Sequence, residues 1–314
     1  MVYNEFCEEL KYSVQSIIGR GYVISLLDDN KLNGIIRNSI VIMKDGESVA
    51  PALYLEECYN DYLKGISLDV IAAGIINAYF NNYKSLDNIK VSLMGFKQVS
   101  DKIFFKLINY DKNIDYLKGL AHIRWMDLAI TFSILIKNDL TGSASINIKN
   151  DMLDYWQVSI DTLMELAEQN TPKLFKANVK RMNDIIEEII ISQFKESGST
   201  DIDDILKDLI ISSNTLDNAD NLYVATNVSG VNGAAWLLYN NELRNLSENL
   251  GSNLYILPSS IHEVIIVPSG KQMAKYDLFQ MVKEVNETQV PYMEILSNNV
   301  YLYDYEKDHL TALF

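Results

Sequence analysis

Apolar and polar positions along this chain follow two periods, which together predict a mixture of helices and strands. Phe6, Leu10 and Val14 recur at helical spacing and predict a helix over residues 2–18. The run LAITFSILI at residues 128–136 is apolar almost throughout and rich in β-branched side chains, as expected of a buried strand. The chain therefore combines both kinds of element from its first half onwards.

The same patterns place the other elements. Further strands are expected at residues 22–27, 35–43, 52–55, 91–93, 145–148, 222–226 and 300–303, and on both sides of residues 258–263. Further helices are expected at residues 56–64, 67–83, 151–156, 159–169, 179–195, 201–210, 242–250 and 276–286. Residues 102–107 fit either type. Because strands and helices do not alternate strictly, the sequence predicts an α+β fold with mixed, mainly antiparallel sheets and packed helices.

One order of elements recurs along the chain. A strand, a short helix containing Asp-Tyr and a second helix opened by serine are expected over residues 52–69 and again over residues 145–161. A looser third copy starts at Gly233. This recurrence predicts repeated strand-helix-helix units. Internal duplication explains it, and so does chance reuse of the same helix caps.

The expected elements fall into three regions. We expect an N-terminal α+β region over residues 1–118, a middle α+β region over 119–197 and a C-terminal α+β region over 198–314. The small, polar segment ESGST at 196–200 is the best linker candidate. The segment KDGE at 44–47 is typical of a hairpin turn.

Charge narrows the range of partners. The net charge is −15, so phosphate-rich nucleic acids and anionic membrane surfaces repel the protein, and no basic stripe offsets this. Nucleic-acid binding is not expected. Cys7 and Cys58 lie in helical patterns among apolar neighbours, which favours buried free thiols over a disulfide.

Two further observations bear on location. The first ten residues lack the basic and apolar stretches of a signal peptide. No run of the chain approaches the roughly 20 apolar residues that cross a membrane. We therefore expect a cytoplasmic protein with no membrane association.

Several segments together carry a family resemblance. They are PALYLEECY at 51–59, KLINY at 106–110, HIRWMDLA at 122–129, NTP at 170–172, GAAWLLY at 233–239, LYILPSSIHEVIIVP at 254–268 and VYLYDY at 300–305. With them, the chain resembles, nearly end to end, a bacterial family catalogued as a domain of unknown function, number 5688. Since that family brings no known reaction, the resemblance implies no mechanism.

The most polar part of this pattern is an island between two apolar runs. Ser259, Ser260, His262 and Glu263 lie together between the strands expected on either side. A serine and a histidine in hydrogen-bond contact can act as nucleophile and base, which makes Ser260, His262 and Glu263 the candidate catalytic residues. The nucleophile-elbow motif is absent, however. The alternative is a turn whose hydroxyl and imidazole groups satisfy the backbone.

The same island excludes a helical zinc peptidase. That signature needs a second histidine four residues after the first, on the same helix face, and position 266 is isoleucine. The flanking residues are also of strand type. We expect no metal site and no cofactor.

A second polar group precedes the buried run at 128–136. Arg124 and Asp127 are three residues apart and would form an ion pair if that segment were helical. They are candidate binding residues, together with Ser259 and Tyr239, which ends the GAAWLLY segment. A structural ion pair is favoured over a substrate-binding arginine.

The function favoured by these patterns is non-enzymatic. Nineteen tyrosines, clustered around 54–62 and 301–305, and a strongly acidic composition favour an interaction or accessory protein with a protein partner. The alternative is a hydrolase-like enzyme that uses the Ser/His/Glu cluster at 259–263. The sequence leaves the oligomeric state open.

Overall fold

The computed structural model describes residues 1–45, 52–86, 95–139, 142–197, 222–270 and 274–314. The chain divides into two compact units, Met1–Gly95 and Phe96–Phe314.

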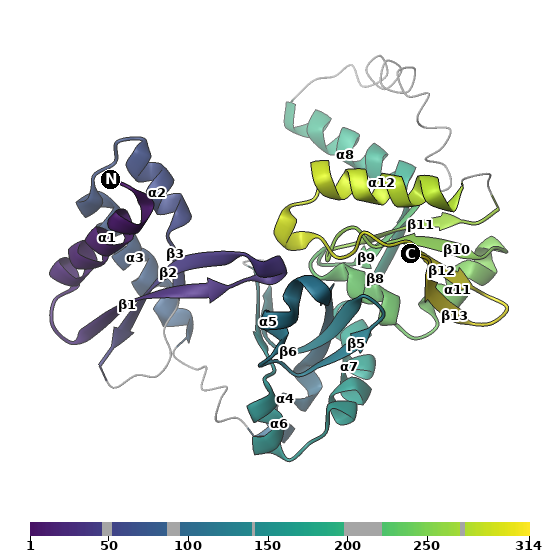
Figure 1. The fold of residues 1–314 in the computed structure, drawn as a ribbon, viewed down its shortest axis with the longest axis horizontal. Helices are drawn as coiled ribbons and strands as arrows, with labels where there is room; N and C mark the ends of the chain where they lie inside the picture. The colour runs from purple at the N-terminus through teal and green to yellow at the C-terminus, as the bar shows by residue number, and fades with distance from the viewer. Residues whose placement is uncertain (46–51, 87–94, 140–141, 198–221, 271–273) are drawn as a thin grey trace. The chain divides into compact units, whose positions relative to one another are not determined.

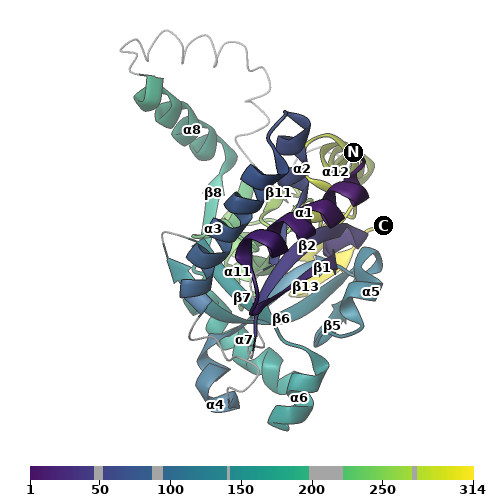
Figure 2. The same cartoon turned by 90° about the vertical axis from the view of Figure 1, so that its left-hand side faces the viewer.

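In the first unit, a three-stranded antiparallel sheet of order β1-β2-β3 packs against helices (Figures 1 and 2). The β1–β2 hairpin runs from the pair Tyr22–Lys44 to the pair Asn30–Ile36, and β3 pairs with the other edge of β2. The elements are α1 (Tyr3–Ile18), β1 (Tyr22–Asn30), η1 (Leu32–Gly34), β2 (Ile36–Lys44), β3 (Ala52–Tyr54), α2 (Glu56–Leu63) and α3 (Leu68–Leu86).

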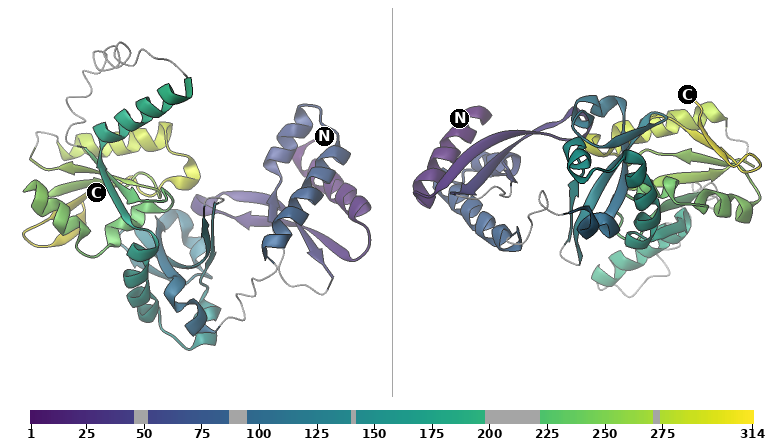
Figure 3. Two further views of the ribbon diagram at one scale, coloured as in Figure 1. Left: turned by 180° about the vertical axis from the view of Figure 1, so that it is seen from behind. Right: turned by 90° about the horizontal axis from the view of Figure 1, so that it is seen from below.

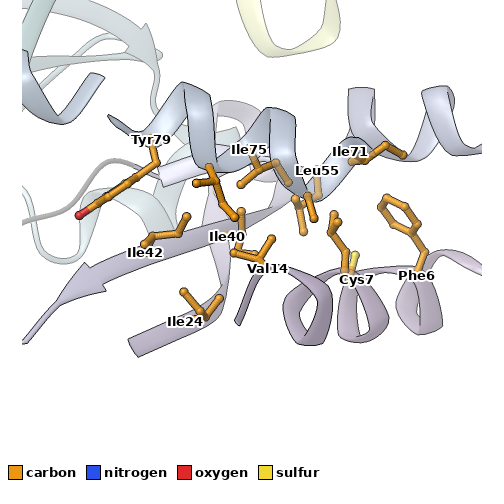
Figure 4. Close-up of a cluster of buried hydrophobic side chains, with 13 residues drawn as sticks. Phe6, Cys7, Val14, Ile24, Ile40, Ile42, Leu55, Ile71, Ile75 and Tyr79 are labelled. Carbon is orange, nitrogen blue, oxygen red and sulfur yellow. The ribbon is translucent and has the colours of Figure 1, made fainter. Parts of the chain in front are cut away.

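The core of this unit lies between α1, α3 and the sheet (Figure 4). Helix α1 contributes Phe6, Leu10 and Val14, all fully buried, so the helical stripe expected there forms the core face. Helix α3 contributes Ile71 and Ile75, which Figure 4 shows facing α1. Burial of these aliphatic side chains stabilises the unit by roughly 2 kcal/mol for each.

The second unit contains two antiparallel sheets, the first of which has the order β4-β6-β5, with β7 also paired to β6. Figure 2 shows β5, β6 and β7 with α7 and α6 close by. The elements of this part are α4 (Phe96–Val99), η3 (Ser100–Lys102), β4 (Ile103–Asn109), η4 (Asp111–Asn113), α5 (Ile114–Leu117), β5 (His122–Trp125), β6 (Leu128–Asp139), β7 (Gly142–Asn147), α6 (Asn150–Trp156) and α7 (Ile160–Leu174).

The second sheet has six strands in the order β13-β12-β10-β11-β9-β8. Helix α12 packs on one face through Leu278 and Val282, which contact Leu257 and Val267 of the sheet. Figures 1 and 3 show α12 lying alongside the strands of this sheet, and Figure 2 shows α8 well apart from α12. The elements are β8 (Ala177–Arg181), α8 (Met182–Ser197), β9 (Tyr223–Asn227), η5 (Gly233–Leu238), α11 (Glu242–Leu250), β10 (Leu254–Leu257), β11 (Val264–Pro268), α12 (Lys275–Thr288), η6 (Tyr292–Glu294), β12 (Tyr301–Asp304) and β13 (His309–Ala312).

Helix α7 covers the outer edge of β4. The Thr171 hydroxyl accepts a hydrogen bond from the backbone N–H of Phe105 at 3.2 Å, and the Asn170 amide donates to the carbonyl of Ile103 at 3.1 Å. Ser159 caps the start of the helix by accepting from the backbone N–H of Thr162 at 3.2 Å. On this edge of the sheet, polar side chains of the NTP segment thus bind backbone groups of β4 that a neighbouring strand would otherwise bind.

The expected α+β class is confirmed, with all strand pairs antiparallel among the described residues. Both strand-helix-helix orders are present, as β3-α2-α3 and β7-α6-α7. Of residues 102–107, Lys102 ends η3 and the rest lie in strand β4. The helix expected at 179–195 was partly wrong: residues 177–181 form strand β8, because they pair with β9, and the helix starts at Met182.

The two units differ from the three regions expected from the sequence. Strand β4 pairs with β6 across the expected boundary at 118/119, and β8 pairs with β9 across the one at 197/198. The strand expected at 91–93, the helix at 201–210 and parts of the turn at 44–47 and the linker at 196–200 lie outside the described residues. No helix in the described part is long and apolar enough to cross a membrane. The cytoplasmic location stays a prediction.

Candidate functional site

The polar island at Pro258–Glu263 connects β10 to β11, as the apolar flanks predicted. Its backbone is bonded to a distant segment. The carbonyls of Pro258 and Ser259 accept from the N–H groups of Ser297 and Leu296, each at 2.9 Å, and the N–H of Ile261 donates to the carbonyl of Glu294 at 2.9 Å. These bonds hold the turn against residues 294–297, which we call the 294–297 segment.

Within the turn, serine and histidine do not form a nucleophile–base pair. The Ser260 hydroxyl accepts from the backbone N–H of His262 at 3.0 Å, and Nδ1 of His262 accepts from the backbone N–H of Asn232 at 3.3 Å. The remaining ring nitrogen, Nε2, lies 3.7 Å from Oε1 of Glu294. Both ring nitrogens therefore face groups other than Ser260, and the hydroxyl stabilises the turn itself.

A glycine makes this packing feasible. A side chain on Gly233 would collide with the Thr226 hydroxyl and the His262 carbonyl, and would lie 2.9 Å from the backbone nitrogen of Asn227. The Thr226 hydroxyl donates to that same carbonyl at 2.7 Å. The GAAWLLY segment thus starts with glycine because only a bare Cα fits against the island.

Glu263 is a half-buried carboxyl group at the end of the island. Burial raises the pKa of its carboxyl above the usual range; the nearby Glu294 adds to the rise, and His262 partly offsets it. Nε2 of His262 lies 3.7 Å from Oε1 of Glu294, so the imidazole of the turn faces the carboxylate of the neighbouring segment. The cluster is thus an electrostatic contact between the turn and the 294–297 segment.

The expected pairing of Arg124 with Asp127 was wrong. Residues 126–127 form the turn of the β5–β6 hairpin rather than a helix, so spacing by three does not bring the two side chains together. Arg124 is exposed, lies over the Tyr110 ring at 4.3 Å and is 4.0 Å from the carboxylate of Asp111. At this exposure such an ion pair contributes little.

Asp127 instead reaches the C-terminal part of the unit. Its carboxylate accepts hydrogen bonds from the Ser297 hydroxyl and the Tyr301 hydroxyl, both at 2.6 Å. Burial, followed by the Asp127 charge, raises the pKa of Tyr301, so this phenol remains protonated and donating. These bonds couple the first sheet of the unit to the second.

The 294–297 segment is where these interactions meet. The buried Asn109 amide at the end of β4 donates to the Leu296 carbonyl at 2.9 Å, and the Asn286 amide of α12 donates to the Ser297 carbonyl at 2.8 Å. The island, the turn that contains Asp127, the end of β4 and helix α12 are thus all hydrogen-bonded to the 294–297 segment. This polar network fixes the packing of the second unit.

The two remaining candidate residues are buried. The Tyr239 hydroxyl donates to the Phe175 carbonyl at 2.6 Å, and burial raises its pKa. Tyr239 lines a cavity of about 10 Å³, room for about one water molecule. Ser259 is 7% exposed. The structure brings Ser259, Ser260, His262 and Glu263 together, but shows no contact between them and Arg124 or Tyr239.

Sequence reasoning missed a groove in the first unit. It has a volume of about 500 Å³ and lies along β3, α2 and α3. Its lining consists of Arg37, Leu53, Tyr54, Glu57, Cys58, Asp61, Ile66, Val70, Ile71, Gly74, Ile75 and Ala78. The signal in the sequence was the spacing of Val70, Gly74 and Ala78, which places small side chains along one line of α3.

The groove has apolar walls and an acidic end. Val70 is 61% exposed and Ile66 39%, so these aliphatic walls of the groove are open to solvent. The Arg37 guanidinium is already bound, 2.9 Å from Glu56 and 4.0 Å above the Tyr54 ring. Burial, together with Asp61 and Glu57, raises the pKa of the Cys58 thiol, so this cysteine is not a reactive thiolate.

The tyrosine clusters mostly serve the core rather than a surface. Tyr59 and Tyr62 pack against Phe6 with ring centroids at 5.1 and 5.3 Å, and Tyr301 and Tyr303 are buried. Only Tyr54 lines the groove. Among the described residues, no group of three histidine, cysteine, aspartate or glutamate side chains is arranged to hold a metal ion.

Comparison with known proteins gives one match. Neither the curated proteins nor the solved structures contain a match to this chain. The model of a family described as a family of unknown function, DUF5688, matches residues 3–305. Because that match covers nearly the whole chain, the protein belongs to the DUF5688 family.

Proposed function

We propose that this protein is an interaction or accessory protein that binds a segment of a protein partner in the groove of the first unit. The observation that carries the proposal is the groove itself, a concavity of about 500 Å³ whose apolar walls are left open to solvent. A groove of this kind suits an amphipathic helix or an extended apolar segment, because each buries its own apolar side chains there.

The charges around the groove define the partner further. Glu57 and Asp61 are one helical turn apart on α2, and both line the groove. Arg37 does not offset them, because Glu56 already pairs with it, and the exposed ion pair of Lys64 with Asp61 at 3.1 Å neutralises Asp61 only weakly. Electrostatic complementarity therefore favours a partner segment that carries lysine or arginine next to its apolar residues. The net charge of −15 acts in the same direction over longer range.

The hydrolase alternative has no comparable support. Catalysis by Ser260 needs a ring nitrogen of His262 within hydrogen-bond reach of the hydroxyl. Here Nδ1 accepts from Asn232, and the hydroxyl accepts from the backbone of the turn. The geometry of the island matches a stabilised turn.

Peptide selection tests the proposal directly. A library of random peptides displayed on phage is selected against the full chain, and the enriched peptides are synthesised and titrated. We expect peptides with apolar residues at helical or alternating spacing flanked by lysine or arginine. Gly74→Leu should weaken their binding by about tenfold or more, since the new side chain fills the groove. Space for it exists, because a Cβ on Gly74 meets no atom within 4 Å.

Controls separate groove filling from unfolding. Leucine at a helix-interior glycine is expected to raise thermal stability, so lost binding by a more stable variant cannot reflect misfolding. Tyr12→Leu changes an exposed side chain of α1 that does not line the groove and should leave binding unchanged. Charge reversal by Asp61→Lys should weaken binding and reduce its salt dependence. Selection of no common pattern, or of peptides that bind Gly74→Leu equally well, would contradict the proposal.

A further inference from the structure

One face of the first sheet in the second unit carries a row of polar side chains. Lys106 of β4 lies opposite Thr131 of β6, which in turn lies opposite His122 of β5. Further along β6, Ser133 is opposite Asn147 of β7. Residues directly opposite in antiparallel strands share a face, as do residues two apart in one strand. The row therefore continues from Lys106 to β7, where Ser145 lies two residues before Asn147.

Hydrogen bonds join most of these side chains. The Lys106 ammonium donates to the Ser145 hydroxyl at 2.9 Å. The Ser133 hydroxyl, which is fully buried, donates to Oδ1 of Asn147 at 2.9 Å, and the Asn147 amide donates to the Tyr116 hydroxyl at 2.7 Å. We call Lys106, Ser145, Ser133, Asn147 and Tyr116 the Lys106 cluster.

Lys106 brings a charge into this cluster that no carboxylate in the described part of the chain balances. Among the described residues, no carboxylate lies within ion-pair distance of its Nζ atom. Burial alone lowers the pKa of Lys106 to about 8. The chain has 42 acidic and 27 basic residues. A shortage of carboxylates therefore does not explain why none of the described ones pairs with Lys106. Buried charges in proteins are normally paired.

We propose that the Lys106 cluster binds the carboxylate group of a small organic acid. The ammonium has three donors and uses one on Ser145, and the Ser145 hydroxyl that accepts this bond keeps its own proton to donate. The two oxygens of a carboxylate can therefore accept one bond from each group. Lys106 and Ser145 both remain partly exposed, so a ligand can reach them.

A single carboxylate fits the charge of the site better than a phosphate. The cluster supplies one positive charge, and its other members are neutral hydroxyl and amide groups. His122, on the same face, lies with Nδ1 2.8 Å from the Leu120 carbonyl, so this nitrogen donates its proton there. A doubly charged phosphate would leave one charge unbalanced in a partly buried site.

Ligand titration with defined probes tests the inference. Acetate, propionate and benzoate are titrated against the full chain by thermal denaturation and calorimetry, with inorganic phosphate as the comparison anion. A carboxylate that binds the native state should raise the melting temperature with concentration. Lys106→Met should weaken binding by about tenfold or more, and Ser145→Ala by a smaller factor. Lys112→Met, at another partly buried lysine of this unit, should leave it unchanged.

A measurement on the unmodified protein guards against effects of the substitutions on folding. Reductive methylation of lysines by formaldehyde and a borane reductant, followed by mass spectrometry, should show slower modification of Lys106 when the carboxylate is present and no change at Lys112. Stronger binding of phosphate than of every carboxylate would overturn the proposed ligand class. Equal carboxylate binding by Lys106→Met, or no protection of Lys106, would overturn the site.

Discussion

Lys106 illustrates how one residue can work against stability. An ammonium with its pKa lowered by burial costs free energy as long as it stays protonated in the folded state. In the unfolded chain, the same lysine titrates near its ordinary value of 10.5. A residue kept at such a cost is typical of a functional site rather than of a core.

Stability should accordingly depend on pH through Lys106. Between about pH 8 and 10.5 the unfolded chain binds more protons at this residue than the folded one, so its contribution makes the free energy of unfolding rise with pH. Lys106→Met should be more stable than the unmodified protein at pH 7, by roughly 1 to 3 kcal/mol, with the difference shrinking towards pH 10. Urea denaturation across this range measures it. A constant difference would contradict the pH linkage.

At the residue scale, the sequence located the polar island but not its partners. The apolar runs on both sides of the island can be read from the local sequence, and they place the island between two strands. The bonds that decide its chemistry come from Asn232 and Glu294, about 30 positions away on either side of His262. Only the fold brings those residues to the ring. The same holds for Asp127 and Tyr301, which are 174 positions apart.

At the scale of elements, the most instructive pair is β4 with α7. A strand at the edge of a sheet has backbone groups without strand partners, and here two side chains of α7 bind two of them. The helix pattern of residues 159–169 was evident from the sequence, but this role was not, because it depends on which strand the helix meets. Strand β8 was missed for the same reason: its short run is defined by pairing with β9.

Removal of the Thr171 hydroxyl should destabilise this edge. In Thr171→Val the N–H of Phe105 loses its acceptor while it stays buried, which costs about 1–3 kcal/mol of unfolding free energy. Thr171→Ser keeps the oxygen and should cost less than the valine variant, although valine is the closer match in shape. Chemical denaturation compares the two variants. If valine were tolerated better than serine, the hydrogen bond would not be what holds the edge.

At the scale of the whole molecule, each unit has a core of its own. Helices α1 and α3 enclose the core of the first unit, and α12 with its sheet encloses a core in the second. The boundary between the units follows α3 and precedes α4, where the sequence offered no glycine- and proline-rich linker. Composition therefore did not reveal it.

Two self-contained cores predict independent folding. A fragment of residues 1–95 and a fragment of residues 96–314 should each unfold cooperatively by circular dichroism, and the first should retain peptide binding in its groove. The intact chain serves as the control. Fragments that stay unfolded apart and regain structure only on mixing would show that the units depend on each other.

The hydrogen bonds by which α7 covers the edge of β4 also affect how the protein behaves when it partly unfolds. The strand reads IFFKLIN, a short segment of high β-propensity with a single charge and no proline, which is the composition of segments that aggregate as stacked strands. While α7 is in place, Asn170 and Thr171 occupy the edge on which another chain would add. Fraying of one helix would thus convert the folded molecule into a template for fibrous assembly, and that hazard gives the polar NTP segment a protective role.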